Sequence, residues 1–530
     1  MRTLIARSLG MVLETLSAER VQKTGAMSQV CVATQFARDN WLRVVAVSGL
    51  LLLPCFWHRR IEAGDLGSHL YNAWLAQLIA KGQAPGLYIS RRWSNVLFDL
   101  VLVTLGNRLG LAAAEKIAVS ASVLLFFWGT FALLSAVTQR APWFLLPCLA
   151  MLAYGWTFNV GFFNFYLSLG LGFFATAILW RVVSEAREER VGLGQASARV
   201  SAVDLAIALV LSALVLVAHP QGFVWMVGCL VYVLLWTRLP GAFKLLIPGA
   251  AVAVIVAAAW YLPRHYTSYT VWDDYGAGLY NGVDQLALYS TKFRVLAGAA
   301  LAFGILCFVM DAVGRKAWAP LRPPLGLYLV AVVATYLLPD SIRLPLYPGW
   351  LGFQALRLTT MSAAMGLCVL GFMRRKRWHS LGFAAIALLF FAFLYQATGT
   401  LNRMEAQIEG LVAGLPPGEH VTATIWAAPD SRIPNVVHMA DRACIGKCFS
   451  FQNYEPASGE FRVRVRQNSR IVSADPGVNE QMEAGEYLVK PEDLPMAHIY
   501  QCVAADLTRL CLRQLSAGEL NGRLGYHRVR

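Results

Sequence analysis

The stretch of residues 58–95 reads HRRIEAGDLGSHLYNAWLAQLIAKGQAPGLYISRRWSN and lies between the first two strongly apolar segments of the chain. Its first part carries the ionisable residues Glu62, Asp65 and His69, and an amphipathic run over residues 70–80 follows them. Carboxylates are costly inside a bilayer and useful for chemistry at its surface. We therefore predict a polar loop that carries a candidate site and continues into a helix at the membrane interface.

The composition around this stretch is typical of a membrane protein. Of 530 residues, 57% are hydrophobic and only 15% are charged. Apolar runs near 20 residues, about long enough to cross a bilayer, recur along the chain. The net charge of +15 requires no nucleic acid partner, because Lys and Arg collect in loops between apolar segments, as at residues 374–377. We predict an α-helical polytopic membrane protein with about 11–13 transmembrane helices and a C-terminal extracytoplasmic α+β domain.

Residues 1–40 are a mixed polar and apolar arm without the features of a signal peptide. We expect a cytoplasmic arm; an upstream start codon is the alternative. A multi-pass domain over residues 41–400 follows, with residues 58–95 as its large first external loop. Its apolar segments are 41–57, 96–111, 117–137, 143–157, 162–182, 203–218, 223–236, 245–262, 295–310, 325–338, 358–372 and 381–395.

Basic residues indicate the orientation of these segments. They precede segment 41–57, which places the N-terminus in the cytoplasm, and the cluster 374–377 sends the last segment and the tail outside. Twelve complete crossings would instead leave both termini on one side. Segment 96–111 carries Asp99, Asn107 and Arg108, so we expect it to be embedded in protein without crossing fully. A further helix missed elsewhere is the alternative.

The tail, residues 401–530, has a different character. Short strand-like stretches alternate with turn signals, which predicts a small α+β domain. Cys444, Cys448, Cys502 and Cys511 lie within it and indicate a compartment that permits disulfides. The two local pairs are the simplest choice among three pairings. A zinc site is the competing interpretation, although the Cys444–Cys448 spacing is loose and no matching His pair follows.

Three residues of the first loop are candidate catalytic groups. Asp65 and His69 are four residues apart, so on a helix they share a face. A carboxylate here could serve as general base toward an acceptor hydroxyl, or hold a divalent cation that bridges a phosphate. Glu62, one helical turn earlier, is the alternative acid. The structural interpretation of Asp65 is a cap on the following helix.

Further polar residues lie at the external ends of apolar segments. Asn164 could line a cavity or bond between helices, and His219 ends a segment beside Pro220. Asp273 and Asp274 form an acidic and aromatic loop suited to a sugar ring, or simply a solvated loop. We predict all four as candidate substrate-binding residues.

Two arginines lie in an external loop, where the positive-inside rule disfavours them. Arg343 and Arg357 flank a stretch rich in proline and aromatic residues. An arginine fork matches phosphate oxygens bidentately. We predict a phosphate contact, with a lipid headgroup or a neighbouring acid as the alternative partner.

These features together resemble the GT-C superfamily of integral membrane glycosyltransferases. The resemblance rests on a first helix leading outward, an acid near the start of the first loop, an interfacial helix, and Gly82 and Pro85 downstream. It implies an enzyme that takes its sugar from a polyprenyl-phosphate lipid. The tail stretch RACIGKCFSFQNYEPASGEFRVRVR, residues 442–466, resembles uncharacterised bacterial multi-pass proteins, so we expect a bacterial inner-membrane protein. Asp65 would deprotonate the acceptor, and Arg343 or Arg357 would contact the donor phosphate. The family's paired-acid motif is absent.

Two other classes of function remain open on the sequence. A transporter or flippase of a lipid-linked precursor is the first, although the clear apolar segments carry few of the charges that mark transport paths. A membrane assembly or scaffold protein acting through its tail is the second. Neither a G-x-x-x-x-G-K-[ST] phosphate loop nor a G-x-G-x-x-G fingerprint opens a credible βα unit, which argues against an ATP-driven pump.

Overall fold

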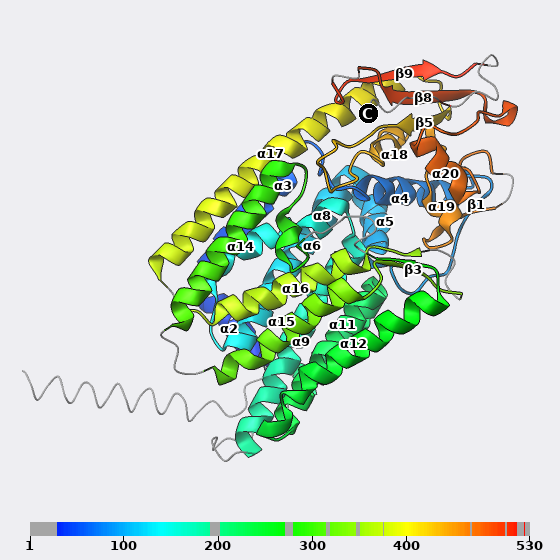
Figure 1. The fold of residues 1–530 in the computed structure, drawn as a ribbon. Coiled ribbons are helices and arrows are strands. Elements are labelled where there is room, and N and C mark those ends of the chain that lie inside the picture. The colour runs from blue at the N-terminus through cyan, green and yellow to red at the C-terminus, as the bar shows by residue number, and fades with distance from the viewer. Residues whose placement is uncertain are drawn as a thin grey trace, which may run out of the picture.

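The computed structural model describes residues 29–190, 202–270, 279–313, 318–345, 350–374, 376–466, 469–503, 506–516 and 524. Eight helical stretches in these ranges are long and apolar enough to cross a membrane, and two apolar helices, Trp41–Phe56 and Ala202–Ala218, are shorter. The chain is therefore an α-helical polytopic membrane protein. A domain that contains strands follows its last membrane helix (Figure 1).

The described helices follow one another along the chain in this order: α2 (Gln29–Asp39), α3 (Trp41–Phe56), α4 (Leu66–Ala80), α5 (Leu97–Leu109), α6 (Leu111–Thr138), η1 (Trp143–Leu145), α7 (Leu146–Ala153), α8 (Trp156–Val160), α9 (Phe163–Arg190), α10 (Ala202–Ala218), α11 (Pro220–Arg238), η2 (Gly241–Phe243), α12 (Leu246–His265), η3 (Val283–Leu286), α14 (Thr291–Ala312), η4 (Ala319–Leu321), α15 (Arg322–Leu337), α16 (Gln354–Gly371), α17 (Arg377–Val412), α18 (Met439–Cys444), α19 (Glu455–Ser458), α20 (Pro476–Glu483) and η5 (Pro491–Asp493).

Small residues bring the central helices of the bundle together. A Cβ on Gly129 of α6 would lie 2.3 Å from the carbonyl oxygen of Gly170 in α9. A Cβ on Gly170 would in turn lie 2.7 Å from the backbone nitrogen of Phe126. Membrane helices gain little from hydrophobic burial against one another, so close backbone packing at small residues holds them together. This contact fixes α6, which follows α5, against α9.

Helix α5 corresponds to the weak segment 96–111. It contains 13 residues, which at 1.5 Å per residue gives about 20 Å, less than the roughly 30 Å of a bilayer's apolar core. The buried side chains of Phe98 and Leu102 are covered by protein. The helix is thus packed beside α4 and α6 at one end of the bundle (Figure 1).

The predicted segment 143–157 is not one regular helix. It consists of η1, α7 and α8, and ends at Gly161, whose φ of +92° favours glycine. A broken helix at membrane depth survives only where protein surrounds it, and 78% of this stretch is buried. The irregular end of α8 therefore lies inside the molecule, where it meets the first loop, residues 58–95.

The last membrane helix is longer than predicted. We expected its apolar part at 381–395 and a new domain from residue 401, but α17 continues without a break to Val412. The reason lies in its sequence, because Leu401, Met404, Ile408 and Val412 recur every three or four residues and all are buried. With 36 residues, or about 54 Å, the helix extends well past the bilayer and supports the tail domain (Figure 1).

The strands form three small sheets. β5 (His420–Thr424), β6 (Phe449–Ser450), β8 (Met496–Gln501) and β9 (Leu510–Gln514) form a sheet of order β6-β5-β8-β9, in which β9 alone is antiparallel to its neighbour. A strap of β2 (Ser268–Tyr269), β3 (Ser341–Arg343) and β4 (Trp350–Leu351) joins two loops of the bundle. β1 (Leu87–Ile89) pairs with β7 (Val463–Val465), so the first loop and the tail domain lie on the same side of the bundle.

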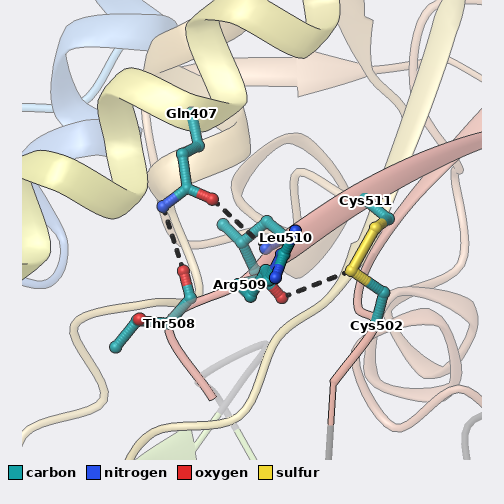
Figure 2. The surroundings of a disulfide bond; sticks show 6 residues. All are labelled: Gln407, Cys502, Thr508, Arg509, Leu510 and Cys511. Atoms are coloured by element: carbon teal, nitrogen blue, oxygen red, sulfur yellow. Dashed lines mark hydrogen bonds between the residues drawn. A yellow bond between two sulfur atoms is a disulfide. The ribbon is translucent and has the colours of Figure 1, made fainter. Parts of the chain in front are cut away.

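The four tail cysteines form two disulfides, Cys444–Cys448 and Cys502–Cys511. Figure 2 shows that the second disulfide joins the ends of β8 and β9, next to α17. The Gln407 side chain of α17 donates to the carbonyl oxygen of Thr508 over 3.0 Å and accepts from the N–H of Leu510 over 3.3 Å. The β8–β9 hairpin is thereby attached to the last membrane helix.

Candidate functional site

A close approach of two backbones places Asp65. The N–H of Gly64 donates to the carbonyl oxygen of Asn159, and the N–H of Asp65 donates to that of Val160, both over 2.8 Å. A Cβ on Gly64 would lie 2.5 Å from the Val160 oxygen, and a Cβ on Gly161 would lie 2.5 Å from the Asp65 nitrogen. Only glycine fits at these two positions, so the turn that carries Asp65 packs tightly on the end of α8.

A third glycine brings the tail domain to the same place. A Cβ on Gly67, in the first turn of α4, would lie 2.4 Å from the carbonyl oxygen of His438. His438 directly precedes α18, and its Nε2 atom lies 3.7 Å from Oδ1 of Asp65. A side chain from the first loop therefore faces one from the tail domain, several hundred residues later in the chain.

The Asp65 side chain does not cap α4. It occupies the N-cap position but forms no capping hydrogen bond. The side chain is 23% exposed, so it remains accessible. Burial raises its pKa from the ordinary value, against the opposing charges of His438, His69 and Arg357. A carboxylate with a raised pKa is a stronger base, which suits removal of a proton from a hydroxyl near neutral pH.

His438 is held by two further residues of the tail. Its Nδ1 lies 2.7 Å from Oδ2 of Asp441, and the Ser450 hydroxyl donates to the other oxygen of that carboxylate. Burial alone would lower the pKa of His438, but the hydrogen bond and charge of Asp441, together with Asp65, raise it to about 9. At neutral pH the ring is therefore a cation, with Nδ1–H directed to Asp441 and Nε2 on the side of Asp65.

His69 and Asn164 meet through Asp99 of α5. The Nδ1 atom of His69 lies 2.7 Å from Oδ1 of Asp99, and Asn164 donates to Oδ2 over 2.9 Å. Asn164 also accepts the N–H of Phe98 over 2.8 Å. Burial lowers the pKa of His69, but the charge and hydrogen bond of Asp99 outweigh it and raise the pKa to about 9. These residues supply a second cation close to Asp65.

Arg357, on α16, and His219, which directly precedes α11, lie beside this group. The guanidinium of Arg357 is 4.4 Å above the Phe162 ring and 5.7 Å from that of Phe165, and the Phe165 ring lies 5.3 Å from His219. Burial lowers the pKa of His219 and the charge of Arg357 lowers it further, while the same charge opposes the rise that burial causes in the pKa of Asp65, so Arg357 is close to both groups. A partly buried arginine on aromatic rings, next to a carboxylate, is a suitable contact for an anionic substrate.

Glu62 belongs to a different cluster. Arg442 of α18 lies 3.2 Å from Glu405 and 3.5 Å from Glu115. Arg60 lies 3.7 Å from Glu405 and donates to Glu409 over 2.9 Å. Burial and the nearby Glu405 carboxyl raise the pKa of Glu62 well above its usual range, so this environment favours the neutral form of its carboxyl. We name these residues the buried ion network, and it joins the first loop to α6, α17 and α18.

Of the remaining predicted contacts, the structure describes Arg343, which is not among the residues around Asp65. Arg343 is exposed on β3, where its backbone pairs with Trp350. Asp273 and Asp274 lie outside the described residues. Within the described ranges no three His, Cys, Asp or Glu side chains are grouped as ligands of a metal ion. The divalent cation considered from the sequence therefore has no ready-made ligand set there.

Sequence reasoning missed His438 and Asp441. The only sequence signal was their spacing of three residues at the start of the run HMADRAC, which places both on one turn of a short helix. Asp99 was noted only as a polar residue in a weak apolar segment. No family model, no curated protein and no solved structure matches the chain, so the functional assignment depends on the residues themselves.

Proposed function

We propose that this protein is a membrane glycosyltransferase that moves a sugar from a polyprenyl-phosphate donor to an acceptor outside the cytoplasm. The observation that carries the proposal is the state of Asp65. Its carboxylate is free of a capping role, partly exposed, raised in pKa, and flanked by three cationic groups, His438, His69 and Arg357. An accessible base among cations suits a reaction between a hydroxyl and a phosphate ester.

The proposed step balances as a direct displacement. Asp65 takes the proton of the acceptor hydroxyl while that oxygen attacks the anomeric carbon of the donor sugar. The bond between the anomeric carbon and the phosphate oxygen breaks, and the phosphate leaves on its lipid with the electron pair. Arg357 and the cationic His438 and His69 stabilise the negative charge that shifts to the phosphate. No nucleotide is consumed, because the donor is already activated.

The proposed location is a bacterial inner membrane with a cytoplasmic N-terminus and an extracytoplasmic tail. The basic cluster at 374–377 and the two tail disulfides support this orientation. The pairing of β1 with β7 requires that the first loop and the tail share a side. The donor lipid would then reach Asp65 from the outer leaflet, past α4 at the interface.

The first prediction concerns the disulfides. Titration of protein denatured without a reducing agent should find no free thiol at Cys444, Cys448, Cys502 or Cys511, because the outer compartment oxidises them. On the chain-entropy account the two short loops together contribute about 4–6 kcal/mol. Reduction before denaturation should expose four more thiols in the matched sample. Four reactive tail thiols in the unreduced protein would remove the support for an external tail.

The second prediction separates the two predicted arginines. Arg357→Gln should raise KM for a radiolabelled polyprenyl-phosphate sugar by a factor of about 10–100, since a charge-assisted hydrogen bond contributes about 1.5–3 kcal/mol. Arg343→Gln is the matched control, and it should leave KM within about twofold because Arg343 is exposed on β3. Equal effects of the two substitutions, or none, would contradict a phosphate contact at Arg357.

A further inference from the structure

A cavity lies between the membrane helices and the tail domain. It has a volume of about 400 Å³. Its walls come from the start of α14, the part of α17 over residues 396–404, the loop after β5, and residues Leu507 and Thr508 of the β8–β9 hairpin. We name it the α14–α17 cleft. The contacts of Gln407 shown in Figure 2 hold the hairpin that forms one of its walls.

The cleft is separate from the site around Asp65. Tyr289 forms part of its wall, and the Tyr289 hydroxyl donates to the side-chain oxygen of Asn159 over 2.7 Å. Asn159 in turn accepts the N–H of Gly64 through its carbonyl oxygen. Because this layer stands between the cleft and the Asp65 turn, a molecule in the cleft would not contact the proposed catalytic carboxylate.

The cleft contains hydrogen-bond donors that have no partner among the residues that the structure describes. Asn435 is 6% exposed and lines the cleft, yet its Nδ2 atom has no hydrogen-bond partner within the described ranges. The Oγ atom of Ser290, also in the wall, has none among the described residues either. A buried polar group without a partner costs free energy comparable to a lost hydrogen bond. Neither donor atom has accessible surface, so a ligand with oxygen acceptors would satisfy both donors through a rotation of the two side chains toward the cleft.

The position of the cleft indicates which ligand can reach it. Lys292 is in the first turn of the membrane helix α14, with its Nζ atom 4.8 Å above the Phe393 ring and 3.2 Å from Oε1 of Gln396. The exposed Arg294 of α14 donates to the carbonyl oxygen of Asp430 over 3.2 Å, and farther along the two helices large apolar side chains are exposed, among them Val295 of α14 and Leu388 of α17. The cleft therefore lies where a bilayer surface meets the protein, with a cation at that boundary and mainly apolar walls.

We propose that the α14–α17 cleft binds an anionic phospholipid of the surrounding membrane. The phosphate and glycerol oxygens accept from Asn435, Ser290 and Lys292, and the upper acyl chains lie against Leu401, Met404 and the apolar faces below. The charge complementarity, the unsatisfied donors and the place at the membrane boundary favour this occupant over a soluble ligand. The site is independent of the proposed sugar transfer.

The test uses the full-length protein in detergent micelles and native mass spectrometry with added phosphatidylglycerol or phosphatidylcholine. We expect the first phosphatidylglycerol to bind saturably and about tenfold more tightly than phosphatidylcholine. Lys292→Gln should remove this preference, and Asn435→Leu should weaken binding of the anionic lipid about tenfold. Lys81→Gln, which removes an exposed lysine after α4, is the matched control and should bind like the wild type.

Two outcomes would overturn the proposal. One is equal affinity for the two lipids, with Lys292→Gln unchanged. The other is displacement of the bound lipid by millimolar inorganic phosphate, which would assign the cleft to a free anion. Lys292 is exposed, so its substitution leaves folding intact, and the elution profile of each variant checks this. Asp65→Asn should retain lipid binding, so failure of this proposal and failure of the transferase proposal are distinguishable.

Discussion

Asp65→Asn is expected to reach the membrane in normal amounts and to lose a factor of about 10²–10⁴ in turnover, the usual contribution of a positioned acid or base. The amide keeps the size of the side chain but cannot accept a proton from the acceptor hydroxyl. Folding should be preserved, because Asp65 makes no capping hydrogen bond and Asn caps about as well as Asp in any case. The measurement is transfer of labelled sugar from a polyprenyl-phosphate donor.

Glu62→Gln is the control for this variant. Burial raises the pKa of Glu62 well above its usual range and favours the neutral acid, whose shape and charge the amide reproduces. Its transfer rate should stay close to that of the wild type. If the Glu62→Gln variant is inactive and the Asp65→Asn variant is active, the base is Glu62 instead of Asp65. Full transfer by both variants would reject the first-loop mechanism, and labelled lipid crossing the bilayer without sugar transfer would identify a transporter.

Arg442→Met should be the most damaging change to stability. Arg442 lies between Glu405 and Glu115, and all three side chains are at most 9% exposed. Its removal leaves two buried carboxylates without their main cation, which typically costs about 3–5 kcal/mol. The α18 helix that carries Asp441 also carries Arg442, so the tail domain should loosen from the bundle. Denaturant unfolding in detergent, followed by circular dichroism, measures the loss.

Arg59→Met is the matched control for that experiment. Arg59 pairs with Glu409 over 3.4 Å, but its side chain is 77% exposed. Exposed pairs contribute little because water screens them, so the unfolding midpoint should hardly move. A second variant, Arg442→Met combined with Glu405→Gln, should recover part of the lost stability, because one of the stranded charges is removed. An Arg442→Met protein as stable as the wild type would show that the network is not structural.

The membrane architecture was predictable because apolar run length and basic loops are local properties of the sequence. The proximity of Asp65 and His69 was predictable for the same reason, since the two residues lie one helical turn apart. The choice between Asp65 and Glu62 as the catalytic base could not be predicted, because it depends on which way each side chain points. The structure places Glu62 against Glu405 of α17 and Asp65 against His438 of the tail.

The role of the tail in the site could not be read from the sequence. His438 reaches Asp65 only because Gly64, Gly67 and Gly161 allow backbones from three separate regions to approach. No periodicity in one segment encodes such a contact. The continuation of α17 to Val412, by contrast, could have been predicted from the spacing of Leu401, Met404 and Ile408. We instead ended the helix where the composition changes from apolar to mixed.

The pairing of β1 with β7 sets an order of events during protein synthesis. Leu87 and Val465 are partners in that pair, and translation proceeds at about 5–20 residues per second, so the first loop is made roughly 20–75 s before its partner strand. For most of this interval Glu405, His438 and Arg442 have yet to be made, so Asp65 lacks its partner from the tail. A nascent chain that is released before the tail is complete therefore carries the candidate base without the surroundings that tune it.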